Sequence, residues 1–334
     1  MKKMLLVAVT AGVVACGTQK NVENANPMEY AETITTSELQ NNLTTFASDE
    51  YEGRNTGEPG QKKAAEFIVK EYQKMGIEAP EGYSNYYQEI PTEFFNGKLK
   101  DSENVLGYIK GSEKPEEILV ITSHYDHVGV DDEGNIFNGA DDGGSGPMAI
   151  LEVAEAFKEA QKDGYTPKRS ILFIHLTGEE KGLLGSKYYV ENPVFPLANT
   201  VANLNMDMIG RIDKDHEGND NYIYLIGSDK LSTDLHELSE NVNSEYMNME
   251  LDYTYNDEND PNRFYYRSDH YNFAKNNIPV IFYFNGVHPD YHKPTDTAEK
   301  IEYEALKKRA QLVFLTAWEI ANRDERLVVD KAEE

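Results

Sequence analysis

Residues 118–126 read Ile-Leu-Val-Ile-Thr-Ser-His-Tyr-Asp, and this stretch decides the fold. The run from Ile118 to Thr122 is short, continuous and apolar or β-branched. Such a run is typical of a strand buried on both faces of a sheet. His124 and Asp126 follow directly, so polar side chains stand where the buried strand ends. We therefore expect a sheet that presents polar residues at the carboxyl ends of its strands.

Similar runs recur along the chain. Further strands are predicted at 170–175, 201–206, 222–226 and 278–284, and residues 82–100 have a strand-like aromatic composition. Helices are predicted from apolar residues at helical spacing at 61–75, 147–160, 232–247 and 297–322. Strands that alternate with helices predict one α/β domain, with a mixed, mainly parallel central sheet and helices on both faces.

The composition is that of an acidic globular protein. Of 334 residues, 39% are hydrophobic, which is enough for a core. Lys and Arg number 32 against 59 Asp and Glu, so the formal net charge is −27. A charge of this sign repels phosphate backbones, and we therefore expect no nucleic-acid partner.

The amino end has the features of an export signal. Lys2 and Lys3 precede an apolar stretch of about a dozen residues, whereas a membrane-spanning helix needs about 20. Residues 1–15 are therefore predicted to be a signal peptide. The sequence Val-Val-Ala-Cys that ends at Cys16 resembles a bacterial lipobox, and ordinary signal cleavage is the alternative.

This interpretation predicts a lipid-anchored protein of the bacterial cell envelope. Residues 16–30 are polar and are predicted to form a lipidated tether, followed by a catalytic domain over 31–334. The membrane is contacted only through the lipid on Cys16, at the outer membrane or the periplasmic face. Because Cys16 is the only cysteine, the mature fold has neither a disulfide nor a thiol nucleophile.

Metal-binding residue types follow each predicted strand or its neighbouring loop. Parallel strands bring their carboxyl ends to one edge of the sheet, so five separate segments deliver ligands to one place. The candidate ligands are His124, Asp142, Glu180, Asp207 and His292.

These residues suit a pair of zinc ions. A short carboxylate such as Asp142 can bridge two cations, with His124 and Asp207 on one ion and Glu180 and His292 on the other. Each ion then has three protein ligands and room for a shared water.

Two neighbouring carboxylates have separate predicted roles. Asp126 is expected to accept the second ring N–H of His124 and to fix its tautomer. Glu179, next to the ligand Glu180, is expected to take a proton from the bridging water and to deliver it to the leaving amine.

The motifs resemble those of the co-catalytic di-zinc aminopeptidases, relatives of glutamate carboxypeptidase. They are His-x-Asp, Gly-Ala-Asp-Asp-Gly-Gly-Ser-Gly (139–146), Gly-Glu-Glu (178–180), Asn-Met-Asp-Met-Ile-Gly (205–210), Ser-Asp-His (268–270) and Tyr-His-Lys-Pro-Thr-Asp-Thr (291–297). The resemblance implies a zinc-exopeptidase fold, Asp142 rather than Asp141 as the bridge, and a cis peptide after Asp142. It also implies that Tyr291 helps to hold an oxyanion. Residues 76–117 are too short for the protease-associated domain of some relatives.

The remaining histidines are given structural roles. His175 lies inside a predicted strand and is expected in the core, whereas His127, His216 and His236 are expected at the surface or in turns. Asp269 and His270 are expected to support their loop.

The most consistent function is that of a zinc aminopeptidase acting on peptides. A glutaminyl cyclase on the same scaffold usually carries Trp before the ligand histidine, where this chain has Tyr291. A non-catalytic relative would have lost ligands. A carboxypeptidase or dipeptidase remains open, because Arg211, Arg263 and Arg267 are available to bind a substrate carboxylate.

Overall fold

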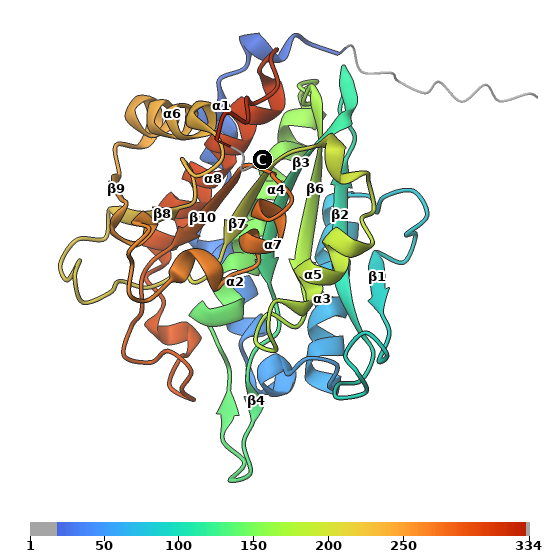
Figure 1. Ribbon diagram of the computed structural model, residues 1–334, viewed down its shortest axis with the longest axis vertical. Coiled ribbons are helices and arrows are strands. Elements are labelled where there is room, and N and C mark those ends of the chain that lie inside the picture. Colours follow the sequence, from blue (N-terminus) through green and yellow to red (C-terminus); the bar gives the residue numbers. More distant parts are fainter. Residues whose placement is uncertain (1–18, 332–334) are drawn as a thin grey trace, which may run out of the picture.

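The protein, described here by a computed structural model over residues 19–331, is built on one eight-stranded sheet (Figure 1). The strand order is β1 (Tyr87–Ile90), β2 (Ser102–Ile109), β6 (Arg169–Leu176), β3 (Lys114–His124), β7 (Thr200–Met206), β10 (Val280–Phe284), β8 (Tyr222–Ile226) and β9 (Glu250–Asp252). Strands β6, β3, β7 and β10 are parallel to one another, and antiparallel pairs join β1 to β2, β2 to β6 and β10 to β8. The predicted mixed, mainly parallel sheet is confirmed.

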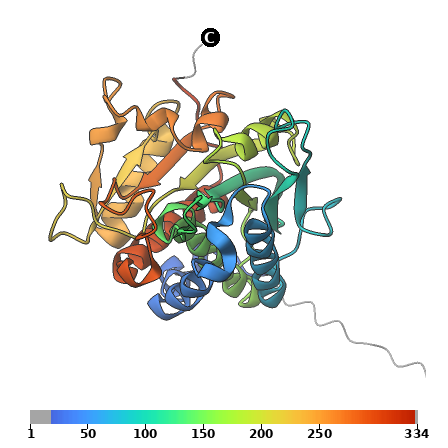
Figure 2. The same cartoon turned by 90° about the horizontal axis from the view of Figure 1, so that it is seen from below.

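Helices cover both faces of this sheet, as the turned view shows (Figure 2). One face carries α3 (Pro59–Met75), α4 (Gly146–Lys162) and α8 (Tyr303–Asn322), and the other carries α5 (Leu184–Glu191) and α7 (His270–Ala274). The central strands are buried along their whole parallel segments because apolar side chains on both faces meet helices. Buried apolar residues form one large cluster on the first face and two smaller clusters on the other.

Several predicted boundaries change in the structure. Helix α3 starts at Pro59 rather than at residue 61 and ends at Met75 as predicted, where Gly76 with φ of 73° forms the left-handed cap expected from a glycine. The last helix starts at Tyr303 rather than near 297, because residues 298–300 form a separate 3-10 turn. A short hairpin of β4 (Gly129–Val130) and β5 (Ile136–Phe137), which no sequence pattern indicated, projects from the carboxyl-end edge of the sheet (Figure 1).

The segment that precedes the domain also differs from expectation. Residues 16–30 were expected to be a tether, but a 3-10 turn (Val22–Asn24) and α1 (Pro27–Ala31) pack on the domain. Val22 is buried, and the Tyr30 ring stacks on Trp318 with 5.8 Å between centroids. Apolar contacts of these few side chains hold the segment down. The predicted signal peptide and Cys16 lie outside the described residues.

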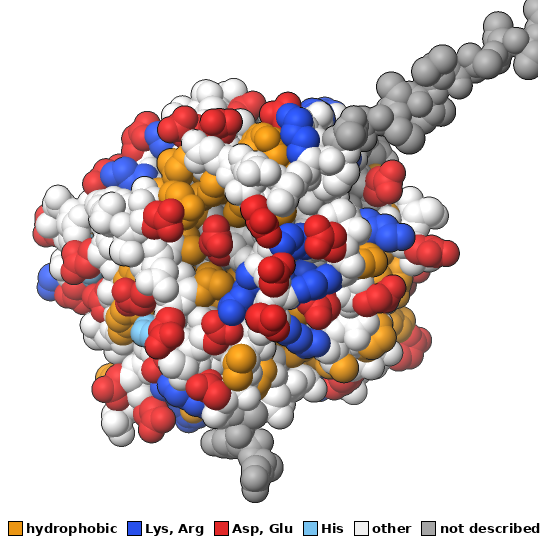
Figure 3. Space-filling view, turned by 90° about the horizontal axis from the view of Figure 1, so that it is seen from above, with side chains coloured by type: hydrophobic (Ala, Val, Ile, Leu, Met, Phe, Trp, Pro, Cys, Tyr) orange, Lys and Arg blue, Asp and Glu red, His pale blue; other side chains and the backbone are white. Residues whose placement is uncertain are grey.

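Acidic and basic side chains lie near one another on one face of the molecule (Figure 3). On the face seen from above, acidic side chains are scattered among basic ones (Figure 3). Some of the charges are paired, as where Lys168 meets Glu23 and Asp324 at 3.0 and 2.7 Å. None of the helices within residues 19–331 combines the length and the hydropathy needed to cross a bilayer.

Candidate active site

The five predicted ligands meet at the carboxyl-end edge of the sheet. His124 is the last residue of β3, and Asp207 follows the last residue of the neighbouring β7. Glu180 lies in the loop after β6, and His292 in the loop after β10. Asp142 lies in the turn 141–145 that leads into α4. The sheet topology therefore brings together ligands that are far apart in the sequence.

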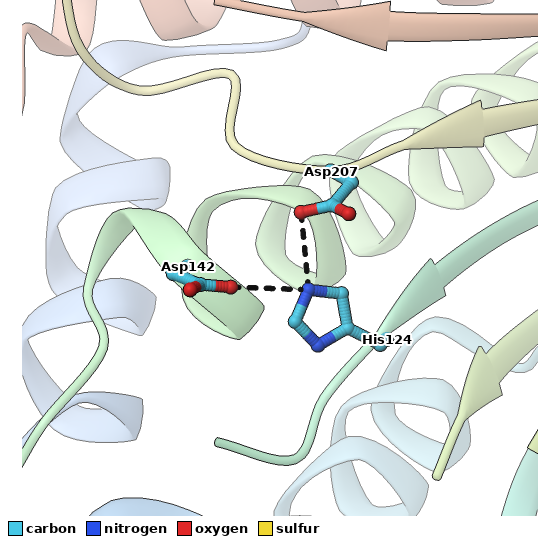
Figure 4. Close-up of side chains that lie close together, drawn as sticks. All are labelled: His124, Asp142 and Asp207. Atoms are coloured by element: carbon cyan, nitrogen blue, oxygen red, sulfur yellow. Dashed lines mark hydrogen bonds and ion pairs between the residues drawn. The ribbon is translucent and has the colours of Figure 1, made fainter. Parts of the chain in front are cut away.

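The first donor set is largely buried, although the Asp207 side chain is 12% exposed. The Nε2 atom of His124 lies 3.3 Å from Oδ1 of Asp142 and 3.1 Å from Oδ1 of Asp207. Figure 4 shows this nitrogen pointing toward both carboxylates. His124 is 1% exposed, so its ring is shielded from bulk solvent.

The second donor set uses the other oxygen of Asp142. His292 Nε2 lies 3.0 Å from Asp142 Oδ2 and 3.2 Å from Glu180 Oε2. Asp142 therefore stands between two groups of nitrogen and oxygen donors, with one oxygen facing each. A third histidine adjoins this set, because His127 Nδ1 lies 2.9 Å from Glu180 Oε1.

The donor atoms fit zinc. Bonds of about 2.0–2.1 Å in tetrahedral geometry separate two ligands of one ion by roughly 3.3–3.5 Å. The measured nitrogen–oxygen separations of 3.0–3.3 Å in both sets are close to this value. Imidazole and carboxylate are also the ligand types that zinc takes in catalytic sites. The residues present are therefore suited to hold the metal.

The same proximity changes how the groups titrate. Contacts with Asp142 and then Glu180 raise the pKa of His292 to about 10. Burial opposes ionisation of Glu180, but hydrogen bonds from His127 and His292 prevail and lower its pKa to about 2. Burial likewise opposes protonation of His124, and Asp207 and Asp142 outweigh it and raise its pKa well above the usual value. Without metal, protons take the place of cations between these carboxylates.

Asp126 has a different role from the one expected. The Nδ1 atom of His124 is 3.1 Å from the main-chain oxygen of Asp126 and 3.9 Å from its carboxylate. The carboxylate instead accepts hydrogen bonds from the Thr56 hydroxyl at 2.7 Å and from the Glu179 N–H at 3.1 Å. The backbone carbonyl thus orients the His124 ring, and the carboxylate holds the start of the Glu179-Glu180 turn.

The turn that carries Asp142 is held by hydrogen bonds to Asp296. Asp296 Oδ2 accepts the main-chain N–H groups of Asp141 and Asp142 at 3.0 and 3.2 Å. The expected cis peptide after Asp142 is not found, since residues 19–331 contain no cis bond. Gly143 instead has φ of 72°, and a Cβ there would lie 2.4 Å from the carbonyl oxygen of Asp126. Glycine at this position lets the turn approach the end of β3.

A pocket opens beside the two donor sets. Glu179 and Tyr291 line it together with Asp142, Asp207 and His292. The Tyr291 ring stacks on that of His292 at 4.0 Å between centroids. The far wall is apolar and consists of Met208, Phe264, Phe282, Phe284 and Val287. The pocket therefore combines the candidate catalytic and metal-binding side chains with an apolar recess.

The structure corrects the expectation for one histidine. His127 is fully buried within the site rather than at the surface or in a turn. His216 lies in a turn, as expected, where it is buried and stacks on Tyr222 with 3.5 Å between centroids. His175 lies in the core, as expected, where the Tyr72 hydroxyl is 2.7 Å from its Nε2. The position of His127 directly after the His124-x-Asp126 motif is the one sequence signal that could have indicated its place in the site.

Comparisons with known proteins agree with this geometry. A "Probable leucine aminopeptidase" of Arthroderma benhamiae is 28% identical over 287 residues, which cover 78% of this chain and 76% of that protein. Aminopeptidase YwaD of Bacillus subtilis is 29% identical over 244 residues, or 67% of this chain and 46% of that protein.

Solved structures share the fold at lower identity. LapA aminopeptidase of Legionella pneumophila has a TM-score of 0.69 and 21% identity, covering 97% of this chain and 81% of that one. BSAP, a zinc aminopeptidase from Bacillus subtilis, has a TM-score of 0.66 and 17% identity, covering 87% and 96%. Residues 104–317, which span β2 to α8 and include every predicted ligand, match the description Peptidase family M28. On this match over more than half of its length, the chain belongs to peptidase family M28.

Proposed function

We propose that the protein is a zinc-dependent aminopeptidase, an exopeptidase that removes residues from the amino ends of peptides. Membership of peptidase family M28 supports the hydrolysis of peptide bonds. The observation that carries the proposal is the position of Asp142, whose two oxygens face two different donor sets. A carboxylate so placed is suited to bridge two cations.

Two zinc ions fit these donors. His124, Asp142 and Asp207 would hold one ion, and Asp142, Glu180 and His292 the other. Three protein ligands per ion leave a position for water, as catalytic zinc sites require. Bound there, the ions would polarise the carbonyl group of the substrate and lower the pKa of a shared water.

Glu179 is the group that we assign to proton transfer. It lines the pocket beside Asp142 and Asp207, and its backbone is held by Asp126. Burial and then neighbouring carboxylates such as Asp207 raise the pKa of Glu179 well above its usual value. Positive charge nearby lowers a carboxyl pKa, which brings the group toward the range of a general base at neutral pH. Glu179 then takes a proton from water and gives it to the leaving amine.

Tyr291 is placed to act on the carbonyl oxygen. Burial, followed by the charge of Asp142, raises the pKa of the Tyr291 phenol, so the hydroxyl keeps its proton. The same side chain lines the pocket with both donor sets. An O–H donor in this pocket can stabilise the negative charge that develops on the carbonyl oxygen.

The charges around the pocket favour a substrate with a free amine. Glu179 and Asp207 line it and can attract a protonated amino group. Of the three arginines that could bind a carboxylate, Arg211 is paired with Asp290 at 2.9 Å and Arg263 lines a separate hollow. Arg267 alone of the three lines the pocket, and its guanidinium rests over the Phe264 ring at 4.8 Å.

The test is a set of substrates that separates the possible reactions. Leucyl and alanyl anilides, their N-acetylated forms and peptides with N-terminal Gln are incubated with the zinc-loaded protein. Cleavage of the free anilides that N-acetylation abolishes is expected. Hydrolysis of the acetylated forms, release of C-terminal residues only, or formation of pyroglutamate would each contradict aminopeptidase action.

We also propose that the protein is exported and anchored by a lipid on Cys16. Support comes from the basic start, the short apolar stretch and the lipobox-like Val-Val-Ala-Cys. Labelled palmitate supplied to producing bacteria is expected to enter the protein and to be absent from the Cys16→Ser variant. Equal labelling of both, or of neither, would contradict the proposal.

A further inference from the structure

His127 is a buried histidine that the proposed reaction does not use. Its ring is fully buried, and Nδ1 lies 2.9 Å from Glu180 Oε1 and 3.7 Å from Asp142 Oδ2. Its Nε2 atom is buried without a hydrogen-bond partner among the described residues. The ring therefore interacts through one nitrogen only, and that nitrogen faces a predicted metal ligand.

The position of the ring is fixed by its surroundings. The His127 main-chain N–H donates to the Arg54 carbonyl oxygen at 3.2 Å. On one side lies Gly139, where a Cβ would come within 2.4 Å of the His127 Cδ2 atom. On another side lies the His292 ring, 5.7 Å away between centroids at 68°. The ring thus has little freedom to turn away from Glu180.

The donor atoms of His127, Asp142 and Glu180 lie close enough together to hold a metal ion. His127 Nδ1 is nevertheless farther from the bridging Asp142 Oδ2, at 3.7 Å, than His292 Nε2 is, at 3.0 Å, and its short contact is the one with Glu180 Oε1. A neutral imidazole carries one N–H, and the nitrogen with an acceptor in reach is Nδ1. The distance of 2.9 Å is normal for an N–H···O bond. Meanwhile Oε2, the other oxygen of Glu180, lies 3.2 Å from His292 Nε2 and faces the second donor set.

The first donor set has the same arrangement with different residues. The Ser268 hydroxyl donates to Asp207 Oδ2 at 2.7 Å, while Asp207 Oδ1 faces His124. Asn205 Nδ2 donates to the same hydroxyl at 2.9 Å, so the serine proton points to Asp207. In both sets, therefore, a protein group donates a hydrogen bond to one oxygen of the non-bridging carboxylate, which is Asp207 in the first set and Glu180 in the second.

We propose that His127 is a positioning residue that makes Glu180 a one-oxygen metal ligand. Its Nδ1–H occupies Oε1 and leaves Oε2 for the cation, which keeps a coordination position open for water. Protein groups that hold a metal ligand in this way commonly change metal affinity by about 10–100-fold when removed. This inference rests on the proposed zinc site.

The experiment compares zinc binding by His127→Leu and His127→Asn in the full-length protein. Leucine removes the donor at similar volume, whereas the asparagine amide places an N–H near the position of Nδ1. Zinc is titrated into the metal-free proteins against a chelating dye, and cobalt absorption spectra report coordination number. His236→Leu, at a partly buried histidine next to Ser228, is the matched control.

We expect His127→Leu to weaken the weaker of two zinc equivalents by about 10–100-fold and to shift the cobalt spectrum toward higher coordination. His127→Asn should restore affinity to within several-fold, and the control should be unchanged. Loss of a whole zinc equivalent in both variants would make His127 a direct ligand and overturn the inference. Unchanged zinc affinity with a lower Tm would show that His127 contributes only to packing, and this result would also overturn the inference. Zinc binding without peptide cleavage by the unmodified protein would contradict the proposed function alone.

Discussion

The two donor sets that share Asp142 are held in different ways. His124 and Asp207 come from the ends of the paired strands β3 and β7, and His124 is 1% exposed. Glu180 and His292 come from loops, and the His292 side chain is 40% exposed with φ of 52°. Strand ends are fixed by the sheet, whereas loop ligands depend on local contacts such as the one from His127. We therefore expect the first set to bind metal more tightly and the second to exchange it more readily.

The largest expected effect separates proton transfer from metal binding. Glu179 adjoins the ligand Glu180 but faces the pocket. Glu179→Gln should lower kcat by about 100- to 10,000-fold, because the amide cannot accept a proton. Metal analysis should still give two zinc equivalents. Unchanged turnover would remove Glu179 from its role, and loss of zinc would make it a ligand.

Ligand replacement tests the comparison directly. His292→Ala should lose about one zinc equivalent and leave the tighter one unchanged, because the first set does not include it. His124→Ala should also lose about one equivalent, but the tighter one. The check is equilibrium dialysis followed by metal analysis. Full retention in either variant, or loss of the same equivalent in both, would show that the sets are not distinct.

The pH dependence of zinc uptake follows from the second set. The pKa of His292 is raised to about 10 and that of Glu180 is lowered to about 2, so at neutral pH a proton sits on the histidine. Metal binding must displace this proton. Affinity of the second set should fall by about tenfold for each pH unit below 10, as one proton competes. Zinc titrations at pH 6, 7 and 8 measure this slope, and a flat profile would contradict it.

A smaller effect is expected at the rim of the pocket. Val287 is 41% exposed and lines the apolar wall of the pocket, whose residues include Phe282 and Phe284 of β10. Val287→Ala removes two methyl groups and should change the kcat/KM ratio of leucyl to alanyl anilide by about two- to tenfold. Zinc content should not change. An unaltered ratio would place the side chain of the N-terminal residue elsewhere.

The fold and the candidate ligands could be predicted from the sequence because short local segments indicate both. Runs such as 118–122 predict burial on two faces, and His124, Glu180 and Asp207 follow such runs within a few residues. Asp142 and His292 lie farther along, in the segments that follow β3 and β10, and the choice of Asp142 rested on the family motif. The arrangement of the strands in the sheet then brings the ligands together. The same reasoning identified His124, Asp142, Glu180, Asp207 and His292, all of which the structure places in two sets around Asp142.

What the sequence did not reveal depends on contacts between distant segments. The burial of His127 requires Arg54 and Gly139, neither of which marks it in the sequence. The carboxylate of Asp126 accepts hydrogen bonds from Thr56 and the Glu179 backbone rather than from His124. It lies 3.9 Å from His124 Nδ1, whereas the main-chain oxygen of Asp126 lies 3.1 Å away, and the sequence does not show so small a difference. Packing of residues 22–31 was missed because a few apolar side chains within a polar segment are a weak signal.

Anomalous diffraction at the zinc edge from crystals of the zinc-loaded protein tests the central claim most directly. We predict two peaks separated by about 3.5–4 Å, one on each side of the Asp142 carboxylate. In the Asp142→Asn variant at least one peak should be weakened. A single peak at this position, or peaks elsewhere in the molecule, would contradict the account of two cations joined by Asp142.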